Sequence, residues 1–130
     1  AGAPASAGRT ASSVSLVIPA YNEERRIESP LEAAHEFLAA NFAEFELLLI
    51  DDGSADRTAE IGRAFQERYP GSRLISIPHA GKAAAVRRGL GDATGDFVAF
   101  TDADLATPLS YLLPFVQAAE AGADVVIGSR

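Results

Sequence analysis

The sequence predicts an α/β fold: an open, mostly parallel sheet with helices on both faces. Short apolar runs alternate with segments of helical periodicity along the chain, which is the order that a parallel sheet with helical crossovers requires. The apolar runs are continuous rather than alternating with polar residues, as expected for strands buried on both faces. The length of 130 residues fits a single domain of this kind.

Each predicted strand is a short run rich in Val, Ile, Leu or Phe. The first and third runs stop at Pro19 and Pro78, and the second stops at two aspartates and a glycine. Proline cannot donate a ladder hydrogen bond, so it marks a strand end here. The predicted strands are residues 14–18, 45–50, 73–77, 96–101 and 124–128.

Helical segments fill the gaps between these strands, with apolar residues recurring three or four positions apart. The first begins at Ser29, with Pro30 at the first helical position and Glu32 three residues after the serine. This arrangement predicts a capping box. The predicted helices are residues 29–42, 61–69, 82–93 and 107–122.

Composition limits the possible functions. Residues 1–13 are mostly Ala, Gly and Ser, so we interpret them as a disordered lead before a single domain at 14–130. The net charge of −7 argues against nucleic-acid binding, which favours a basic surface. The longest apolar runs fall far short of the roughly 20 residues that span a bilayer. The absence of cysteine excludes disulfides and thiolate metal sites and fits a cytoplasmic setting.

Polar residues gather where three of the predicted strands end. The segments "PAYNEE", "DDGSADRT" and "DADLATP" follow the first, second and fourth strands. The carboxyl ends of parallel strands share one edge of the sheet, where ligands bind near a reversal of strand order. Acidic side chains that converge there would repel one another unless a cation or hydrogen-bond donors were supplied. The converging residues are Glu23, Asp51, Asp52, Asp102 and Asp104.

These residue types suit a phosphorylated sugar ligand with a metal ion. Asp102 and Asp104 lie two residues apart on extended backbone, so they point the same way with Cα atoms about 6.8 Å apart. One can bind a hard divalent cation directly, and the other can act through water or a ribose. Asp51 and Asp52 can accept hydrogen bonds from sugar hydroxyls or base N–H groups. Lys82 opens a predicted helix, where free N–H groups and a positive charge favour phosphate.

Each cluster alone is also typical of simpler structures. An aspartate pair after a strand often serves only as a turn or a helix cap. His79, between Pro78 and Ala80, is interpreted as a loop histidine rather than a ligand. The occurrence of three acidic clusters at one predicted edge favours the functional interpretation.

In this order and spacing, "VIPAYNEE", "LLLIDDGSADRT", "GKAAAVRRG" and "GDFVAFTDADLATP" resemble family 2 glycosyltransferases of the GT-A fold, which is Rossmann-like. "DADLATP" followed by "VIGSR" is most similar to dolichyl- or polyprenyl-phosphate sugar synthases, closer to the glucosyl than the mannosyl type. The resemblance covers residues 14–130. It implies an inverting transfer of glucose, or next mannose, from a UDP- or GDP-linked sugar to a lipid phosphate, with UDP favoured. It also implies Mg²⁺ or Mn²⁺ as cofactor.

The resemblance further implies roles for individual residues. Asp104 would be the main metal ligand, with Asp102 beside it also touching ribose and diphosphate. Lys82 would lie near the base or diphosphate, and Arg130 would assist the donor diphosphate. The full set implied to bind the nucleotide sugar is Pro19, Ala20, Tyr21, Asn22, Glu23, Ile50, Asp51, Asp52, Gly81, Lys82, Asp102, Ala103, Asp104 and Arg130.

The sequence departs from the family pattern at His79 and Ala83, where many relatives have Asn and Gly, and at Ala106, where mannosyl relatives commonly have a polar residue. Relatives also continue beyond Arg130. We therefore expect the chain to be the donor-binding half of a longer enzyme. Membrane contact is expected only from the missing carboxyl-terminal part, at the cytoplasmic face of a membrane.

Two other interpretations stay open. A phosphoryl-transfer enzyme of the haloacid-dehalogenase type also places Asp-x-Asp after a strand, but after its first strand and with its lysine downstream. Here the pair follows the fourth predicted strand, and Lys82 is upstream. A non-catalytic nucleotide-binding module would bind UDP with metal and transfer no sugar.

Overall fold

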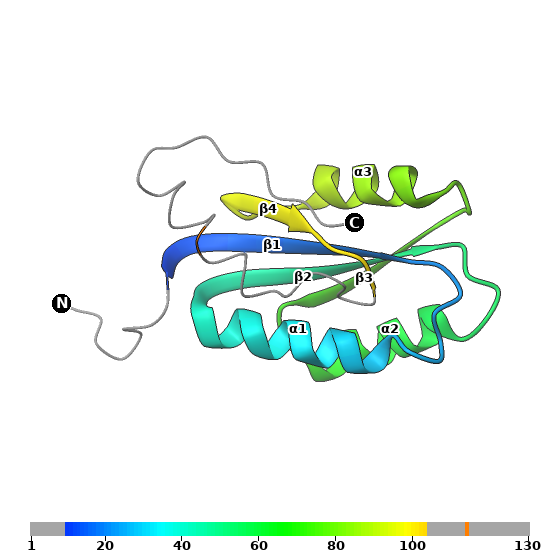
Figure 1. The fold of residues 1–130 in the computed structure, drawn as a ribbon, viewed down its shortest axis with the longest axis horizontal. Coiled ribbons are helices and arrows are strands. Elements are labelled where there is room, and N and C mark those ends of the chain that lie inside the picture. The colour runs from blue at the N-terminus through cyan, green and yellow to red at the C-terminus, as the bar shows by residue number, and fades with distance from the viewer. Residues whose placement is uncertain (1–9, 104–113, 115–130) are drawn as a thin grey trace.

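The computed structural model describes residues 10–103 and Pro114, and within them it shows a four-stranded sheet with three helices (Figure 1). All neighbouring strands are parallel, in the order β3-β2-β1-β4. The predicted parallel sheet is confirmed. The predicted fifth strand lies outside the described residues, and so does the predicted fourth helix apart from Pro114, which is helical. The elements are β1 (Thr10–Ala20), α1 (Glu28–Asn41), β2 (Phe42–Asp52), α2 (Thr58–Arg68), β3 (Ser72–Ile77), α3 (Lys82–Asp92) and β4 (Phe97–Phe100).

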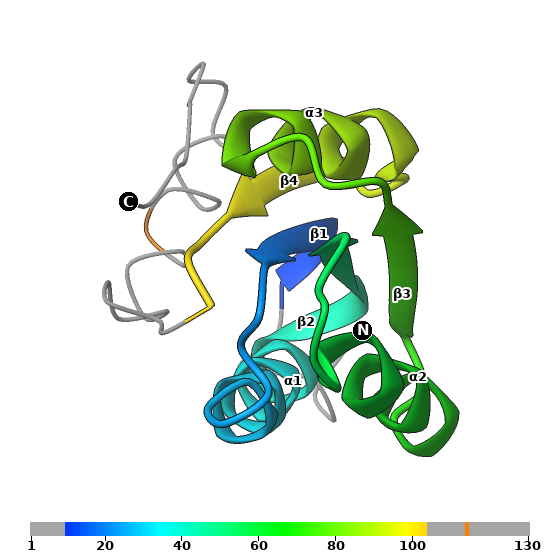
Figure 2. The same ribbon diagram turned by 90° about the vertical axis from the view of Figure 1, so that its right-hand side faces the viewer.

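Helices cover both faces of the sheet, as predicted. Figure 2 shows α3 on one face and α1 with α2 on the other. On the α1 side, Leu31 and Leu38 are fully buried in the larger core cluster. On the α3 side, Ala85 packs with Val17 and Ile50, all at 0% exposure. The strands are therefore apolar on both faces because each face meets a helix.

The predicted capping box at Ser29 is wrong. Helix α1 begins at Glu28, its N-cap position is Ile27, and no side chain caps it. The backbone N–H of Ile27 already donates to the carbonyl of Glu23 at 2.9 Å, and Ile27 is fully buried, so the chain turns into the helix before the serine. Pro30 is tolerated because the N–H groups of a first helical turn have no intrahelical partner.

Three elements begin at least three residues earlier than predicted, among them β2, which begins at Phe42 rather than at residue 45. β1 begins at Thr10, and the Ser13 and Asp96 backbones are tied together: the N–H of Ser13 donates to the Asp96 carboxylate at 3.3 Å, and the N–H of Asp96 donates to Ser13 Oγ at 2.8 Å. Tertiary pairing thus extends the strand beyond the apolar run on which the prediction was based. α2 begins at Thr58 rather than Ile61, and the prediction missed this first turn because it is polar and shows no apolar periodicity.

The strand order reverses at β1. The chain runs outward from β1 through β2 to β3, and β4 then pairs on the other side of β1. The register aligns the carboxyl ends, with Ala20 opposite Asp51 and Asp52 opposite Ile77. Ligands of open α/β sheets bind beyond such a reversal. In the described part of the chain, no helix is both long and apolar enough to cross a bilayer.

Candidate functional site

A cleft of about 440 Å³ opens at the carboxyl edge of the sheet, beside the reversal of strand order. Segments that follow three strands and the start of α3 all contribute to its wall. Nine of the fourteen residues predicted to bind a ligand line it. The lining residues are Pro19, Ala20, Tyr21, Glu23, Arg26, Asp52, His79, Gly81, Lys82, Ala85, Asp102 and Ala103.

The loops after β1 and β2 are joined by hydrogen bonds between side chains and backbone. The N–H of Asn22 donates to Ser54 Oγ, and Asn22 Oδ1 accepts from the backbone N–H of Ala55, both at 2.8 Å. The N–H of Glu23 donates to Thr58 Oγ1 at 2.8 Å. Asn22 has φ +54°, a conformation that asparagine tolerates better than most residues. Asn22 therefore serves the scaffold and does not line the cleft, although it was predicted to bind the ligand.

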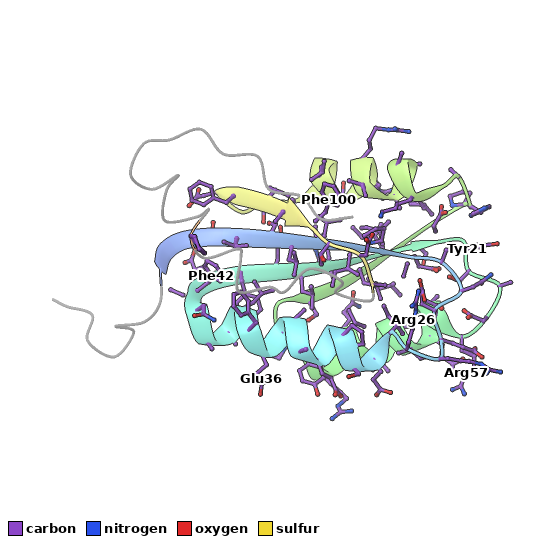
Figure 3. All side chains as sticks on the ribbon, in the orientation of Figure 1. Tyr21, Arg26, Glu36, Phe42, Arg57 and Phe100 are labelled. Atoms are coloured by element: carbon purple, nitrogen blue, oxygen red, sulfur yellow. The ribbon has the colours of Figure 1, made fainter. Side chains whose placement is uncertain are left out.

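Tyr21 and His79 form an aromatic pair on the cleft wall. Their ring centroids lie 4.2 Å apart with an interplanar angle of 21°. Tyr21 is 44% exposed, and Figure 3 shows it with Arg26 at the end of the molecule where β1 stops. A half-exposed, flat aromatic surface of this kind can stack a base.

Asp52 holds the loop that precedes α3. Its buried carboxylate accepts hydrogen bonds from the N–H groups of Ala80 at 2.8 Å and Gly81 at 3.0 Å, and His79 Nδ1 lies 2.9 Å from Oδ2. Burial by itself would raise the pKa of Asp52. The two N–H groups and the nearby imidazole outweigh it, so the pKa is lowered from its ordinary value of 3.8.

This lowered pKa predicts a contribution of Asp52 to acid sensitivity. A carboxyl group whose pKa is lower in the folded state stabilises the fold fully above its unfolded pKa, and that stabilisation is lost as the pH falls through the folded pKa. Between pH 7 and pH values below 3.8, we expect the native chain to lose more unfolding free energy than Asp52→Asn. Urea denaturation of both proteins at each pH measures the difference, and equal losses would show that Asp52 contributes nothing.

Two neighbouring residues that were predicted to bind the ligand lie beneath the cleft. Asp51 is 3% exposed, and it accepts hydrogen bonds from the N–H of Ser54 at 3.1 Å and from Ser76 Oγ at 3.3 Å. Ile50 is fully buried in the α3-side core. Neither residue lines the cleft. Asp51 lies on the opposite face of β2 from Asp52, and Ile50, on the same face as Asp52, is packed against Ala85 of α3.

Lys82 and Asp102 form an ion pair across the cleft floor. Lys82 is the first residue of α3, and Gly81 before it has φ +103°, which glycine adopts without strain. Asp102 follows β4, whose path continues as the N–H of Thr101 donates to the carbonyl of Val17 at 3.0 Å. The pair therefore places one cation and one carboxylate at the point where strand order reverses.

The donor set fits a divalent cation in part. One oxygen of Asp102 faces Lys82, while the other accepts no hydrogen bond from a described residue. Within residues 10–103 and Pro114, no group of three His, Cys, Asp or Glu residues is arranged to hold a metal. A cation here would thus rely on Asp102, on water and on a ligand phosphate, which suits Mg²⁺ chemistry. Asp104, predicted as the main metal ligand, and Arg130, predicted to assist the donor diphosphate, both lie outside the described residues.

Three lining residues were not predicted as ligand contacts. Arg26 pairs with Glu23 through two hydrogen bonds of 2.5 and 3.1 Å. The sequence signal that could have identified Arg26 is its position three residues after Glu23, a predicted site residue of opposite charge. Ala85 lies one helical turn after Lys82. His79 was interpreted as a loop residue, and only its position two residues before Gly81 pointed to the site.

The chain is similar to known proteins in sequence. Residues 15–130 match the family model described as Glycosyl transferase family 2. A dolichyl-phosphate beta-glucosyltransferase from Trichomonas vaginalis is 41% identical over 104 residues, covering 75% of this chain and 32% of the relative. A dolichol-phosphate mannosyltransferase from Pyrococcus furiosus is 33% identical over 117 residues, and the match covers 90% of this chain and 33% of the relative. The chain therefore spans about a third of the length of these curated relatives.

Solved structures show the same fold. A mannosyltransferase from Pyrobaculum calidifontis, in complex with GDP-Man and Mn²⁺, has a TM-score of 0.66 at 29% identity and covers 76% of this chain and 34% of its own. A glucosyl-3-phosphoglycerate synthase from Mycobacterium tuberculosis, in complex with UDP, has a TM-score of 0.64 at 28% identity. The match covers 92% of this chain and 43% of the synthase. The predicted Rossmann-like, GT-A-type fold is confirmed.

Proposed function

Because this chain belongs to glycosyl transferase family 2, we propose that its cleft binds the nucleotide-diphosphate sugar of an inverting hexosyltransferase. The donor we favour is UDP-linked, with glucose before mannose as the sugar. The observation that carries this proposal is the meeting of Lys82 and Asp102 in a cleft at the reversal of strand order. The Lys82 ammonium, together with a divalent cation held by the Asp102 carboxylate, would offset the negative charge of a diphosphate.

The acceptor we propose is a lipid phosphate. The two relatives described above are named for dolichyl or dolichol phosphate, and a third, from Edwardsiella ictaluri and 37% identical over 121 residues, is named for undecaprenyl phosphate. These three acceptors share a polyprenyl chain and a phosphate, although the sugars in the names differ. An acceptor of this kind would bring the cleft to a membrane surface, for which we propose the cytoplasmic face.

The cleft residues would then act on the leaving diphosphate. Lys82, with the free N–H groups at the start of α3, would hold the phosphates and offset the negative charge that grows as the anomeric C–O bond breaks. Asp102, together with Asp104, would hold a divalent cation, which supplies further charge stabilisation when bound. Tyr21 would stack on the base. A phosphate acceptor is already anionic, so the chain needs no strong general base.

The alternatives differ in testable ways. The haloacid-dehalogenase type requires its aspartates after the first strand, whereas Asp102 follows β4 and Lys82 precedes it. A non-catalytic nucleotide-binding module fits the same cleft, and only turnover separates it from a transferase.

Titration calorimetry followed by a transfer assay tests the proposal. We expect UDP to bind in the presence of Mn²⁺ and its affinity to fall when EDTA removes the metal. We also expect transfer of glucose from UDP-glucose to dolichyl phosphate. Binding without transfer or donor hydrolysis would support the non-catalytic module, and no binding of UDP or GDP with or without metal would contradict the proposed site.

A further inference from the structure

β3 forms one edge of the sheet in the part of the chain that the structure describes, where it pairs with β2 alone (Figure 2). The N–H of Leu47 donates to the carbonyl of Gly71 at 2.8 Å, and Leu47 lies opposite Ser72. In a parallel ladder, a residue bonds to the two neighbours of its partner. Every second residue of β3 therefore directs its N–H and C=O away from β2, and these outward residues are Ser72, Leu74 and Ser76.

Helix α2 and the turn after it cover most of the N–H groups on this outer edge. The N–H of Leu74 donates to Oε1 of Gln66 at 2.7 Å, and the N–H of Ser72 donates to the carbonyl of Tyr69 at 3.2 Å. Gln66 lies on the exposed surface of α2, and its side chain reaches back to the strand. Proteins commonly cover edge strands, because unpaired N–H and C=O groups can pair with another chain.

The outer edge of β3 is complementary to itself. If two copies met in antiparallel orientation with Leu74 opposite Leu74, each leucine would donate one backbone hydrogen bond to the other and accept one from it. Ser72 of one copy would then lie opposite Ser76 of the other, so all three outward residues would pair. Arg73 would lie opposite Ile75, so no like charges would face each other. A contact of this kind has two-fold symmetry and closes as a dimer.

We propose that the outer edge of β3 is a pairing surface for a second copy of this chain, and that Gln66 keeps this surface closed. Pairing would require each copy to break the bond between Gln66 and Leu74, so that bond competes directly with the central pair of the dimer. The segment suits pairing, because SRLISI carries one charge and no Pro or Gly. None of these residues lines the cleft, so the inference is independent of the proposed function.

Sedimentation velocity of the native chain and of Gln66→Ala over a range of concentrations tests the proposal. Alanine cannot accept the N–H of Leu74, and its high helix propensity preserves α2. One lost hydrogen bond corresponds to about fivefold, and a symmetric dimer involves two of them, so we expect the association constant of Gln66→Ala to rise about 25-fold. Glu67→Ala is the control, because it removes the next exposed side chain of α2 and should leave self-association as in the native chain.

Hydrogen exchange of the Leu74 and Ser76 amides shows whether a dimer uses this edge. In the native chain we expect slow exchange at Leu74 at every concentration. In Gln66→Ala both amides should exchange rapidly when the protein is dilute and slowly at concentrations where the dimer forms. Adding Ser76→Pro to Gln66→Ala removes an outward N–H without removing a bond to β2, so the dimer should be lost. The exchange measurement on Gln66→Ala decides the matter even if that double variant does not fold.

A Gln66→Ala protein that associates no more strongly than the native chain would overturn the proposal. A dimer of Gln66→Ala in which the Leu74 and Ser76 amides still exchange rapidly would overturn it as well, because another surface would then form the contact.

Discussion

Replacing Asp102 with asparagine is expected to abolish the Mn²⁺-dependent gain in UDP affinity while leaving metal-independent binding at least as strong. Asparagine keeps the shape of the side chain but removes the charge that attracts a cation. Even the loss of a residue that only supports a metal ligand costs about 10- to 100-fold in metal affinity, so loss of a ligand should cost at least as much. It also leaves the positive charge of Lys82, which now pairs with Asp102, free to attract phosphate.

Titration of UDP with Mn²⁺ and with EDTA measures both effects on the same protein. Lys82→Ala should instead weaken UDP binding in both conditions, because the proposed contact of the lysine with phosphate does not depend on a metal. Asp92→Asn is the matched control: Asp92 pairs with Arg88 at 3.1 Å at the other end of α3, away from the cleft, so UDP affinity should not change. A Mn²⁺-dependent gain that persists in Asp102→Asn would contradict the role of Asp102.

The second large effect expected is on stability, from Gly89→Ala. Helix α3 approaches the sheet closely at this residue: a Cβ there would lie 2.3 Å from Val17 Cγ1 and 3.2 Å from Ile50 Cγ1. Both neighbours are fully buried and cannot move aside, and overpacking of this kind costs about 1–3 kcal/mol. Since α3 carries Lys82 at its start, we expect UDP affinity to fall as well.

Gly91→Ala in the same helix separates packing from helix propensity. No atom lies within 4 Å of a Cβ at Gly91, so alanine there should raise the unfolding free energy by about 0.5–1 kcal/mol through its higher helix propensity. Urea denaturation of the two variants beside the native chain measures both changes. If Gly89→Ala were also stabilising, the close approach of α3 to β1 would be contradicted.

The fold could be predicted well from the sequence because strands that are buried on both faces consist mostly of apolar residues. Continuous apolar runs such as residues 45–50 belong to strands covered on both faces, and the polar residues at their ends mark one edge of the sheet. The start of α1 was not predictable in this way. Burial of Ile27 and a backbone turn at Glu23 decided it, and both depend on tertiary packing rather than on capping chemistry.

The candidate site was predicted in position but not in detail. Asp51 and Asp52 are adjacent and identical, and the sequence offers no reason to separate them. The structure separates them because Asp51 bonds inward to Ser54 and Ser76, while Asp52 holds the loop at residues 79–81 along the cleft wall. His79 is held on the cleft wall by stacking on Tyr21, which lies 58 positions earlier in the chain, and no local sequence pattern predicts this contact.

Paramagnetic broadening of backbone amide resonances by Mn²⁺ in the presence of UDP locates the bound metal without any substitution. The proposed site predicts that broadening begins at Lys82, Asp102 and Ala103 and reaches the amides of Tyr21 and Gly81 as Mn²⁺ is added. Residues at the amino-terminal edge of the sheet, such as Ser13 and Gly95, should keep their signals. Broadening centred on that opposite edge, or spread evenly over the chain, would contradict a metal-assisted donor site at the ends of β1 and β4.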